Sequence, residues 1–482
     1  MNLVEIIEKS KFDKSIALKK GNVEISYEQL WNQVYYLEKP DQDRNGTVAI
    51  LMDNSIEFVV AFFSALLNRK SVLLIPSELM ENEVVEMLIK LNVNTIYSLT
   101  KYKEHFSGEY WNSKDIKYVD SIIPNVEFDA INDLKIEYEL DENVDDEVAV
   151  IIPTSGTTSD KKFVQLTHKN IFSNVLTMNE IYRMQKGEIE LLSLPMTSGF
   201  CLTVSLLNCL YSGLKIVIYD GVVFPKRFFE MIRRENVNYF ILVPSVVKLL
   251  SEQSTKSYFY CDSVKRISMG GEKLSESDMK QFLDVFKNTA VIYGYGMTEC
   301  SPVVSTTTLE DYNKKIGTVG RPLKNVKVKV INELGETLSP YEQGEILVKG
   351  PNVMKGYFNS SDTIDDQGWL NTGDVGYLDN ENYLFITGRK KNVIISAGKN
   401  IYPEEIEMVL LDSKLVKDVH VKGISDKSCG ELVVADVVLS EFKTIDDVKK
   451  YCLDNLAYYK IPKLINSCNN IERNAMNKII RK

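Results

Sequence analysis

The stretch EVAVIIPTSGTTSDKK, residues Glu147–Lys162, places a strongly polar loop directly after an apolar run. The apolar run is typical of a buried strand. From Thr154 onward every residue except Asp160 is a hydroxyl residue, glycine or lysine. The common nucleotide loop has a glycine, four further residues and then Gly-Lys-Ser/Thr. No such run follows Gly156, so this is not that loop. Such a loop can surround phosphates with hydroxyls and backbone N–H groups, although Ser/Thr/Gly clusters are also typical of ordinary turns.

Helical and strand-like patterns alternate on both sides of this loop. Upstream, TVAILM and SVLLIP are typical of strands, and SIEFVVAFFSALLNRK is typical of a helix capped by Ser55. The alternation returns between residues 191 and 291, in runs such as GLKIVIYD, YFILVP and VKRISMGG. Strands that alternate with helices predict an α/β fold of doubly wound, largely parallel sheets. The polar segment 101–146 is expected to be a solvated surface connection.

The later part of the chain changes character twice. Residues 316–388 contain short strand-like runs and many turns, as in VKVKVINELGE and GEILVKG, which predicts a small β-rich subdomain. After the basic cluster GRKKN a new α+β pattern runs to the end, and its length suits a small domain. We therefore expect a large N-terminal domain over residues 1–388 and a small α+β domain over residues 389–482.

Composition excludes several classes of protein. The 482 residues exceed what one compact core usually holds. A net charge of -10 argues against nucleic-acid binding, which needs a basic surface. Seven scattered cysteines without a CxxC pair, and only three histidines, predict neither disulfides nor a zinc site. Without a signal-peptide core or a helix long enough to span a bilayer, we expect a cytoplasmic protein with no integral membrane segment.

Four later runs accompany the polar loop in a characteristic order. They are YGYGMTE (293–299), WLNTGD (369–374), GRKKNVIISAGKNIYPEEIE (388–407) and ERNAMNKIIRK (472–482). Together with the loop they resemble the core motifs of the adenylate-forming superfamily, which includes acyl-CoA synthetases, peptide-synthetase adenylation domains and luciferases. Weaker matches such as LVPSVVKLL, MGGEKLSE and GEILVKGPNVMKGYFN fill the gaps, so the resemblance spans nearly the whole chain. Among these proteins the chain is most similar to acyl- and aryl-CoA ligases.

The resemblance implies that ATP and Mg²⁺ are used to turn a carboxylic acid into an acyl-adenylate. Thr298 then contacts the α-phosphate, and Glu299 holds Mg²⁺, which prefers oxygen ligands beside phosphates. Lys478 supplies the cation where negative charge grows between the carboxylate and the α-phosphate. The resemblance assigns the grip on pyrophosphate to Thr154, Ser155, Gly156, Thr157, Thr158 and Lys162.

The nucleotide and acid pockets follow from the same resemblance. Tyr295 matches the aromatic residue that stacks on adenine, Asp374 matches the carboxylate that accepts both ribose hydroxyls, and Arg389 matches an arginine near ribose and phosphate. Gly271 and Glu272 match a segment that lines the adenine and acyl pockets. The residues that this resemblance places in the acid pocket are Ser198, Phe200, Gly294 and Gly296.

The C-terminal domain is expected to move. Lys391 occupies the position of the family's hinge, about which the domain swings after adenylation and withdraws Lys478. The segment around Ala397 and Gly398 then closes a tunnel for a phosphopantetheine thiol, where a glycine lets the thiol arm pass close to the backbone. Closure of this kind protects the acyl-adenylate from water.

Two departures from the family pattern matter. The usual Gly-x-Pro-Lys-Gly tail of the loop is replaced by SDKKF, residues 159–163, which reshapes the loop and adds a negative charge, while the hydroxyl residues and Lys162 remain. No acidic residue occurs between residues 191 and 218. An unpaired α-ammonium group in a buried pocket is costly, so we expect a carboxylic acid without an α-amino group.

Three functions therefore follow from the sequence. The first is an ATP-dependent acid–thiol ligase whose acceptor is CoA or the pantetheine of a carrier protein. The second is a free-standing adenylation enzyme of peptide-synthetase type, which charges an amino acid onto a carrier protein. The third belongs to another class: a non-catalytic nucleotide-binding protein with an altered loop. The residues leave open which acid is activated and which thiol accepts it.

Overall fold

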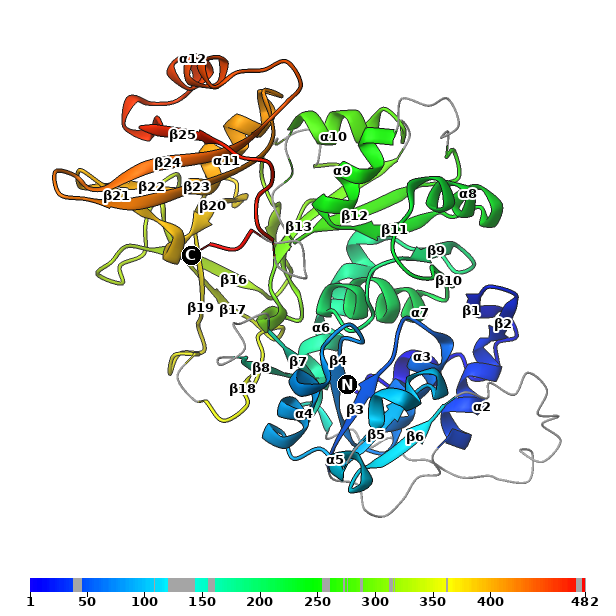
Figure 1. Cartoon of the computed structure of the whole chain (residues 1–482). Helices are drawn as coiled ribbons and strands as arrows, with labels where there is room; N and C mark the ends of the chain where they lie inside the picture. Colours follow the sequence, from blue (N-terminus) through cyan, green and yellow to red (C-terminus); the bar gives the residue numbers. More distant parts are fainter. Residues whose placement is uncertain are drawn as a thin grey trace.

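A computed structural model of the chain describes residues 1–37, 46–107, 109–119, 144–154, 161–253, 261–271, 274, 276–286, 289–311, 315, 317–360, 363–473 and 479–481. The described strands form two large sheets in the N-terminal part and two smaller sheets that follow (Figure 1). The mixed α/β architecture predicted from the sequence is confirmed. Within these ranges, no helix has both the length and the apolar character needed to cross a membrane.

The seven-stranded sheet contains the strand that precedes the polar loop. The strands β7, β4, β3, β5 and β6 run parallel to one another. Beyond β7, the strand β8 pairs antiparallel with β7, and β18 pairs antiparallel with β8. The apolar runs identified in the sequence form its central strands. In spatial order the strands are β18 (Gly356–Tyr357), β8 (Phe163–Thr167), β7 (Val148–Pro153), β4 (Ser71–Ile75), β3 (Thr47–Leu51), β5 (Thr95–Ser98) and β6 (Asp115–Tyr118).

The polar segment 101–146 is more than a surface connection, and that expectation was wrong for its first part. Here η1 (Thr100–Phe106), α5 (Glu109–Asn112) and β6 complete the edge of the seven-stranded sheet. Trp111 is buried and packs edge-on against Phe106, with ring centroids 4.9 Å apart. The polar sequence arises because an edge strand exposes much of its surface, and no residue of β6 is fully buried. Residues 120–143 lie outside the described ranges.

The nine-stranded sheet is parallel in its centre and antiparallel at its edges. Its far edge is formed by the N-terminal strands, since Leu18 pairs with Ile216. In spatial order the strands are β15 (Arg321–Pro322), β14 (Val303–Thr306), β13 (Ala290–Gly296), β12 (Arg266–Gly270), β11 (Tyr239–Leu242), β9 (Ile189–Leu192), β10 (Lys215–Ile218), β1 (Ile16–Lys20) and β2 (Val23–Ser26).

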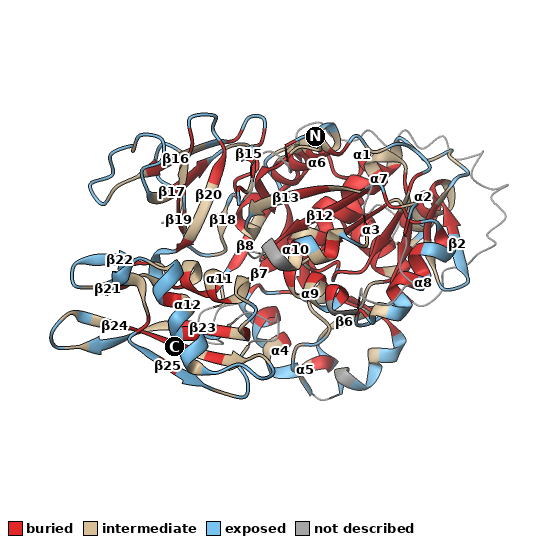
Figure 2. Cartoon of the chain, turned by 90° about the horizontal axis from the view of Figure 1, so that it is seen from above, coloured by how far each residue is buried: buried red, intermediate tan, exposed pale blue. Residues whose placement is uncertain are grey.

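One core joins the two large sheets through the helices α2, α3, α6, η4 and α7. Figure 2 shows this region as mostly buried. The helix α3 begins as predicted, because the Ser55 side chain accepts a hydrogen bond from the Phe58 N–H at 3.0 Å. The helices are α1 (Glu5–Glu8), α2 (Tyr27–Leu37), α3 (Ile56–Leu67), α4 (Glu81–Lys90), α6 (His168–Tyr182), η4 (Cys201–Leu207), α7 (Asn208–Ser212), α8 (Pro225–Glu235), α9 (Pro244–Gln253) and α10 (Glu276–Leu283).

The two smaller sheets follow in the chain. The first is antiparallel and contains β16 (Lys327–Ile331), β17 (Gly344–Lys349), β19 (Leu370–Leu378) and β20 (Leu384–Arg389). Its last strand ends one residue beyond the segment 316–388 that was predicted to be rich in strands. The second contains β21 (Ile394–Ser396), β22 (Lys399–Ile401), β23 (Val416–Asp426), β24 (Gly430–Leu439) and β25 (Leu464–Ser467). With α11 (Pro403–Asp412) and α12 (Ile445–Asn455) it has a hydrophobic core of its own.

Candidate functional site

The polar loop closes at its base between β7 and β8. The Thr154 N–H donates to the Lys162 carbonyl at 2.8 Å, which continues the antiparallel pairing of the two strands. Lys162 Nζ lies over the Tyr357 ring, 4.7 Å from its centroid, whereas Lys161 contacts Glu83 on α4 at 2.6 Å. The structure therefore separates the two lysines of the altered tail, and Lys162 is the one that turns toward Tyr357. The other predicted loop residues, Ser155, Gly156, Thr157 and Thr158, lie outside the described ranges.

Tyr357 on β18 connects this loop to Glu299. Its hydroxyl donates to Glu299 Oε1 at 2.7 Å, and the backbone N–H of Met354 donates to the Glu299 carbonyl at 2.8 Å. Glu299 is buried in η5 (Thr298–Cys300), directly after β13. Burial and the nearby Glu299 carboxylate raise the pKa of Tyr357, so this hydroxyl keeps its proton and remains a donor. Tyr357 lies in the GYFN run of the sequence but was not among the predicted site residues.

The residues around Glu299 fit Mg²⁺ rather than a metal held by protein ligands alone. Among the described residues no group of three acidic, histidine or cysteine side chains is arranged to hold a metal ion. Mg²⁺ is commonly held by one or two carboxylates together with substrate phosphates and water. A single buried carboxylate beside a phosphate-type loop is this kind of partial site.

Asp374 on β19 is the second buried carboxylate of the site. Its Oδ2 accepts a hydrogen bond from the Tyr295 hydroxyl at 2.6 Å, and its Oδ1 lies 3.0 Å from Arg389 Nε. Burial raises the pKa of Asp374, and the Arg389 guanidinium opposes that shift. A carboxylate has about four lone-pair positions, so each oxygen can still accept a ribose hydroxyl. Because Asp374 and Arg389 are register partners on β19 and β20, the sheet itself fixes this pair.

Glycines at the ends of β12 and β13 put no side chains into the region of the predicted acid pocket. A Cβ on Gly270 would lie 3.6 Å from the Phe200 ring. A Cβ on Gly296 would collide with the Pro302 carbonyl. Gly294 faces the Ser305 carbonyl, 3.2 Å from the position of a Cβ. The backbone therefore approaches closely here: Gly296 leaves no space for a side chain, and Gly294 leaves little.

The other residues predicted to line the acid and adenine pockets do not form one cluster in the described structure. Ser198 Oγ donates to the Pro195 carbonyl at 2.8 Å, so its hydroxyl bonds to the local backbone. A Cβ on the next residue, Gly199, would lie 4.0 Å from the Thr298 methyl group, which places this turn beside the motif of Glu299. Gly271 has φ +104, a conformation that favours glycine. Glu272 lies outside the described ranges.

Asn54, which was not among the predicted site residues, holds the segment that leads into this pocket. Its Nδ2 donates to the Leu194 carbonyl at 2.8 Å, and its Oδ1 accepts from the Met196 N–H at 2.8 Å. One amide from the β3–α3 loop thus fixes two backbone groups just before Ser198. The signal in the sequence was weak, since Asn54 stands next to the Ser55 cap and looks like an ordinary turn residue.

We expect Asn54→Ala to raise the KM for the acid about tenfold, because two hydrogen bonds of roughly 0.5–1.5 kcal/mol each are lost at the pocket entrance. The KM for ATP should stay within about twofold of its starting value, on the same scale. Initial-rate kinetics with each substrate varied separately measure both. Asn68→Ala is a matched control, because Asn68 lies beyond the other end of α3 and donates to the Ser64 carbonyl. An equal rise in both KM values would contradict this role.

Three of the predicted C-terminal residues, Lys391, Ala397 and Gly398, lie on or beside the last sheet. Lys391 is exposed in η6 (Lys390–Asn392), between β20 and β21. Ala397 and Gly398, with φ 49 and 74, form the tight turn between β21 and β22. Arg473 contacts Asp418 at 2.8 Å, so this part of the C-terminal tail is tied to β23. On the far side of residues 474–478, Arg481 Nη2 lies 2.6 Å from Glu407.

Lys478 itself lies outside the described ranges. The residues that flank it, Arg473 and Ile479, form an antiparallel bridge. These two described ends are thus held together, and Arg473 also pairs with Asp418 on β23. Any movement of that sheet would carry these ends with it.

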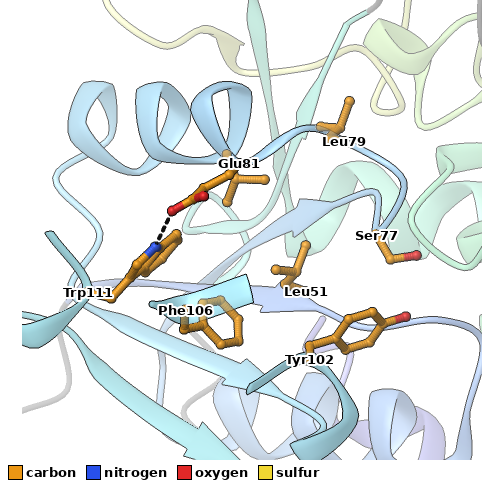
Figure 3. Close-up of a pocket in the computed structure, with 8 residues that line it drawn as sticks. Leu51, Ser77, Leu79, Glu81, Tyr102, Phe106 and Trp111 are labelled. Atoms are coloured by element: carbon orange, nitrogen blue, oxygen red, sulfur yellow. Dashed lines mark hydrogen bonds between the residues drawn. The ribbon is translucent and has the colours of Figure 1, made fainter. Parts of the chain in front are cut away.

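A cavity at the carboxyl ends of β3 and β4 is too small to be a substrate site (Figure 3). Its volume of about 20 Å³ suits roughly one water molecule. Trp111 Nε1 donates to Glu81 Oε1 at 2.7 Å on one side of it. None of its lining residues was predicted as a site residue: Leu51, Ser77, Leu79, Glu81, Val84, Tyr102, Phe106 and Trp111.

The fold, together with Glu299 and the pair of Asp374 and Arg389, points to a class of protein. Residues 8–358 match the AMP-binding enzyme family, and residues 405–478 match the AMP-binding enzyme C-terminal domain. The chain belongs to this family. It is an AMP-forming ligase that uses ATP and Mg²⁺ to activate a carboxylic acid for transfer to a thiol, as the sequence predicted.

Curated relatives and solved structures show which enzymes of this family the chain is similar to. The chain is 31% identical to the 2-succinylbenzoate–CoA ligase of Bacillus subtilis strain 168, over 91% of this chain and 87% of that protein. It is 30% identical to the enzyme of that name from Oceanobacillus iheyensis, over 90% of this chain and 87% of that one. It is also similar to the o-succinylbenzoate CoA synthetase of Bacillus subtilis in complex with its acyl-adenylate, with a TM-score of 0.84, 27% identity and coverage of 98% and 96%. ATP-bound MatB from Rhodopseudomonas palustris shares the fold, with a TM-score of 0.86, 23% identity and coverage of 99% and 97%.

Proposed function

We propose that this chain is an acid–CoA ligase whose nucleotide site is formed by the polar loop, Glu299, Asp374 and Arg389. The observation that carries the proposal is the position of Tyr357, which touches both Lys162 of the loop and the buried Glu299 carboxylate. Two motifs far apart in sequence thus come together at Tyr357, which supports a site for a triphosphate and Mg²⁺ beside it. CoA is proposed as the acceptor because the similar proteins are named CoA ligases.

In the first half-reaction, a carboxylate oxygen of the acid attacks the α-phosphorus of ATP, and the bond to the leaving pyrophosphate breaks. We assign the grip on pyrophosphate to the loop from Thr154 to Lys162 and the ribose hydroxyls to Asp374. Bound Mg²⁺ would be held by Glu299 and would neutralise phosphate charge. Lys478 stabilises the charge on the oxygens between acid and phosphorus, where a fixed cation acts most strongly.

In the second half-reaction, the thiol sulfur attacks the acyl carbonyl carbon, a thioester forms and AMP leaves. We assign residues 1–388 to an adenylating domain and residues 389–482 to a mobile domain that swings about Lys391. The turn at Ala397 and Gly398 then lines the path of the thiol. In support, the last sheet has its own hydrophobic core and can move as a unit. We also place the protein in the cytoplasm, in keeping with its seven free cysteines.

An acid-dependent exchange assay tests this function. Labelled pyrophosphate should enter ATP only when a suitable carboxylic acid is present, and acids without an α-amino group should support the exchange. Exchange supported by amino acids alone would favour the peptide-synthetase alternative. ATP binding measured by calorimetry, with no exchange for any acid, would favour a non-catalytic nucleotide-binding protein.

A further inference from the structure

The two residues that flank Lys162 in the tail of the polar loop both contact α4. Lys161 Nζ lies 2.6 Å from Glu83 Oε1, and Phe163 is buried in the same hydrophobic core as the apolar residues of α4. Successive side chains of an extended chain point to opposite faces. Lys162 therefore points to the other face, where its Nζ lies over the Tyr357 ring. Holding Lys161 and Phe163 on α4 thus determines the side on which Lys162 lies.

The pair of Lys161 and Glu83 is well shielded from water for an ion pair of this kind. The two side chains are 12% and 21% exposed. The second carboxylate oxygen of Glu83, Oε2, accepts a hydrogen bond from the Met80 N–H at 3.2 Å, at the start of α4. The bond from Lys161 holds the pKa of Glu83 below its usual value, so the carboxylate stays ionised at neutral pH. One carboxylate thus joins the first turn of α4 to the tail of the loop.

Lys90 makes a second contact between α4 and the same tail. Its Nζ donates to the Lys161 carbonyl at 3.2 Å and lies over the Phe163 ring, 5.2 Å from the centroid. Glu83 and Lys90 are seven residues apart on the helix, a spacing that places both on one face. This face of α4 therefore contacts residues 161–163 at both of its ends.

These contacts involve the positions at which the chain departs from the family pattern. In the usual tail, Gly-x-Pro-Lys-Gly, a proline precedes the lysine and a glycine follows it, whereas this chain has Lys161 and Phe163 there. A proline restricts the backbone by itself. A lysine or a phenylalanine does so only when its side chain is held, and α4 holds both. Side-chain contacts with α4 thus supply a restraint that the usual tail has in its backbone.

We propose that Glu83 is a positioning residue for adenylation: by holding Lys161 on α4, it keeps Lys162 directed at the pyrophosphate part of ATP. This inference rests on the proposed function, because it takes Lys162 as a group that binds pyrophosphate. Loss of the pair releases the Lys161 ammonium, and a shift of one residue would exchange the faces of the two lysines. A charge that is already oriented stabilises phosphate better than one that must first be oriented.

The test measures KM values for pyrophosphate exchange in variants of the pair. Glu83→Gln and Lys161→Met should each raise the KM for ATP and for pyrophosphate about tenfold, because Lys162 loses its fixed direction. The KM for the acid should stay within about twofold of its starting value, and Lys161→Arg, which keeps the charge, should stay within about twofold for all three substrates. Lys19→Met is a matched control, because Lys19 forms a similarly shielded pair with Glu235 elsewhere in the molecule.

A double-mutant cycle separates positioning from a general structural role. Lys162→Met alone should raise the KM for ATP and for pyrophosphate at least as much as Glu83→Gln does. Adding Glu83→Gln to Lys162→Met should then change both values less than about twofold, because no lysine is left to direct. A structural role predicts the same rise from Glu83→Gln in both backgrounds, and that result would overturn the proposal. Unchanged KM values in Glu83→Gln and Lys161→Met proteins that unfold at the wild-type temperature would overturn it as well.

Failure of this inference can be told apart from failure of the proposed function. If Lys162→Met exchanges pyrophosphate with unchanged KM values, Lys162 does not bind pyrophosphate and the inference is wrong, while the ligase function stands. Absence of exchange with every acid in the wild-type enzyme would instead overturn the proposed function, and this inference with it.

Discussion

Lys478→Ala should slow adenylation about 100- to 1,000-fold, the usual effect of removing one fixed group that stabilises transition-state charge. Formation of the thioester from a supplied acyl-adenylate should change only a few-fold, since Lys478 is proposed to withdraw before that step. Pyrophosphate exchange measures the first half-reaction, and release of AMP from synthetic acyl-adenylate with CoA measures the second. The split between the two is the signature of the proposed swing.

Lys482→Ala is the matched control for this experiment, because it removes the same charge four positions later in the same tail. It should leave both half-reactions nearly unchanged. Lys478→Arg tests whether any cation suffices or whether the length of the lysine side chain matters. If Lys478→Ala slows both half-reactions equally, Lys478 does not act in adenylation alone and the two-position account is wrong.

Local features of the fold were predictable, because they depend on short stretches of sequence. The apolar runs TVAILM and SVLLIP became adjacent parallel strands, and Ser55 caps α3 as its side chain allows. Partners distant in the chain were not predictable. The N-terminal strand β1 joins the nine-stranded sheet through Leu18 and Ile216, and no local pattern specifies that pairing. The edge strand β6 was missed for a related reason, since its polar residues are those of an exposed edge.

The site shows the same division. The motifs located Glu299, Asp374 and Arg389, and the structure places the last two as a direct pair. The residues that hold the motifs in place were missed, since Asn54 and Tyr357 act through contacts with distant segments.

Asp374→Asn should reduce kcat/KM for ATP about 100-fold or more, because hydrogen bonds to a charged group contribute roughly 1.5–3 kcal/mol each and two ribose hydroxyls are proposed to bond this carboxylate. The asparagine has nearly the same shape, but its amide presents N–H groups toward either Tyr295 or Arg389, which are both donors in the native contacts. ATP and 2′,3′-dideoxy-ATP should be compared in the exchange assay. The wild-type enzyme should strongly prefer ATP, and the variant should lose most of that preference.

The nucleotide ratio separates a role in ribose binding from a role in structure. If Asp374 only maintained the fold by pairing with Arg389, Asp374→Asn would weaken the use of both nucleotides equally and leave their ratio intact. Tyr295→Phe provides the matched control: it removes the hydroxyl that donates to Asp374 Oδ2 but leaves the carboxylate and Arg389 in place. That variant should retain the preference for ATP, because the acceptor of the ribose hydroxyls is still present. A variant Asp374→Asn that still discriminates against the dideoxy nucleotide as the wild type does would contradict the assignment of ribose binding to this residue.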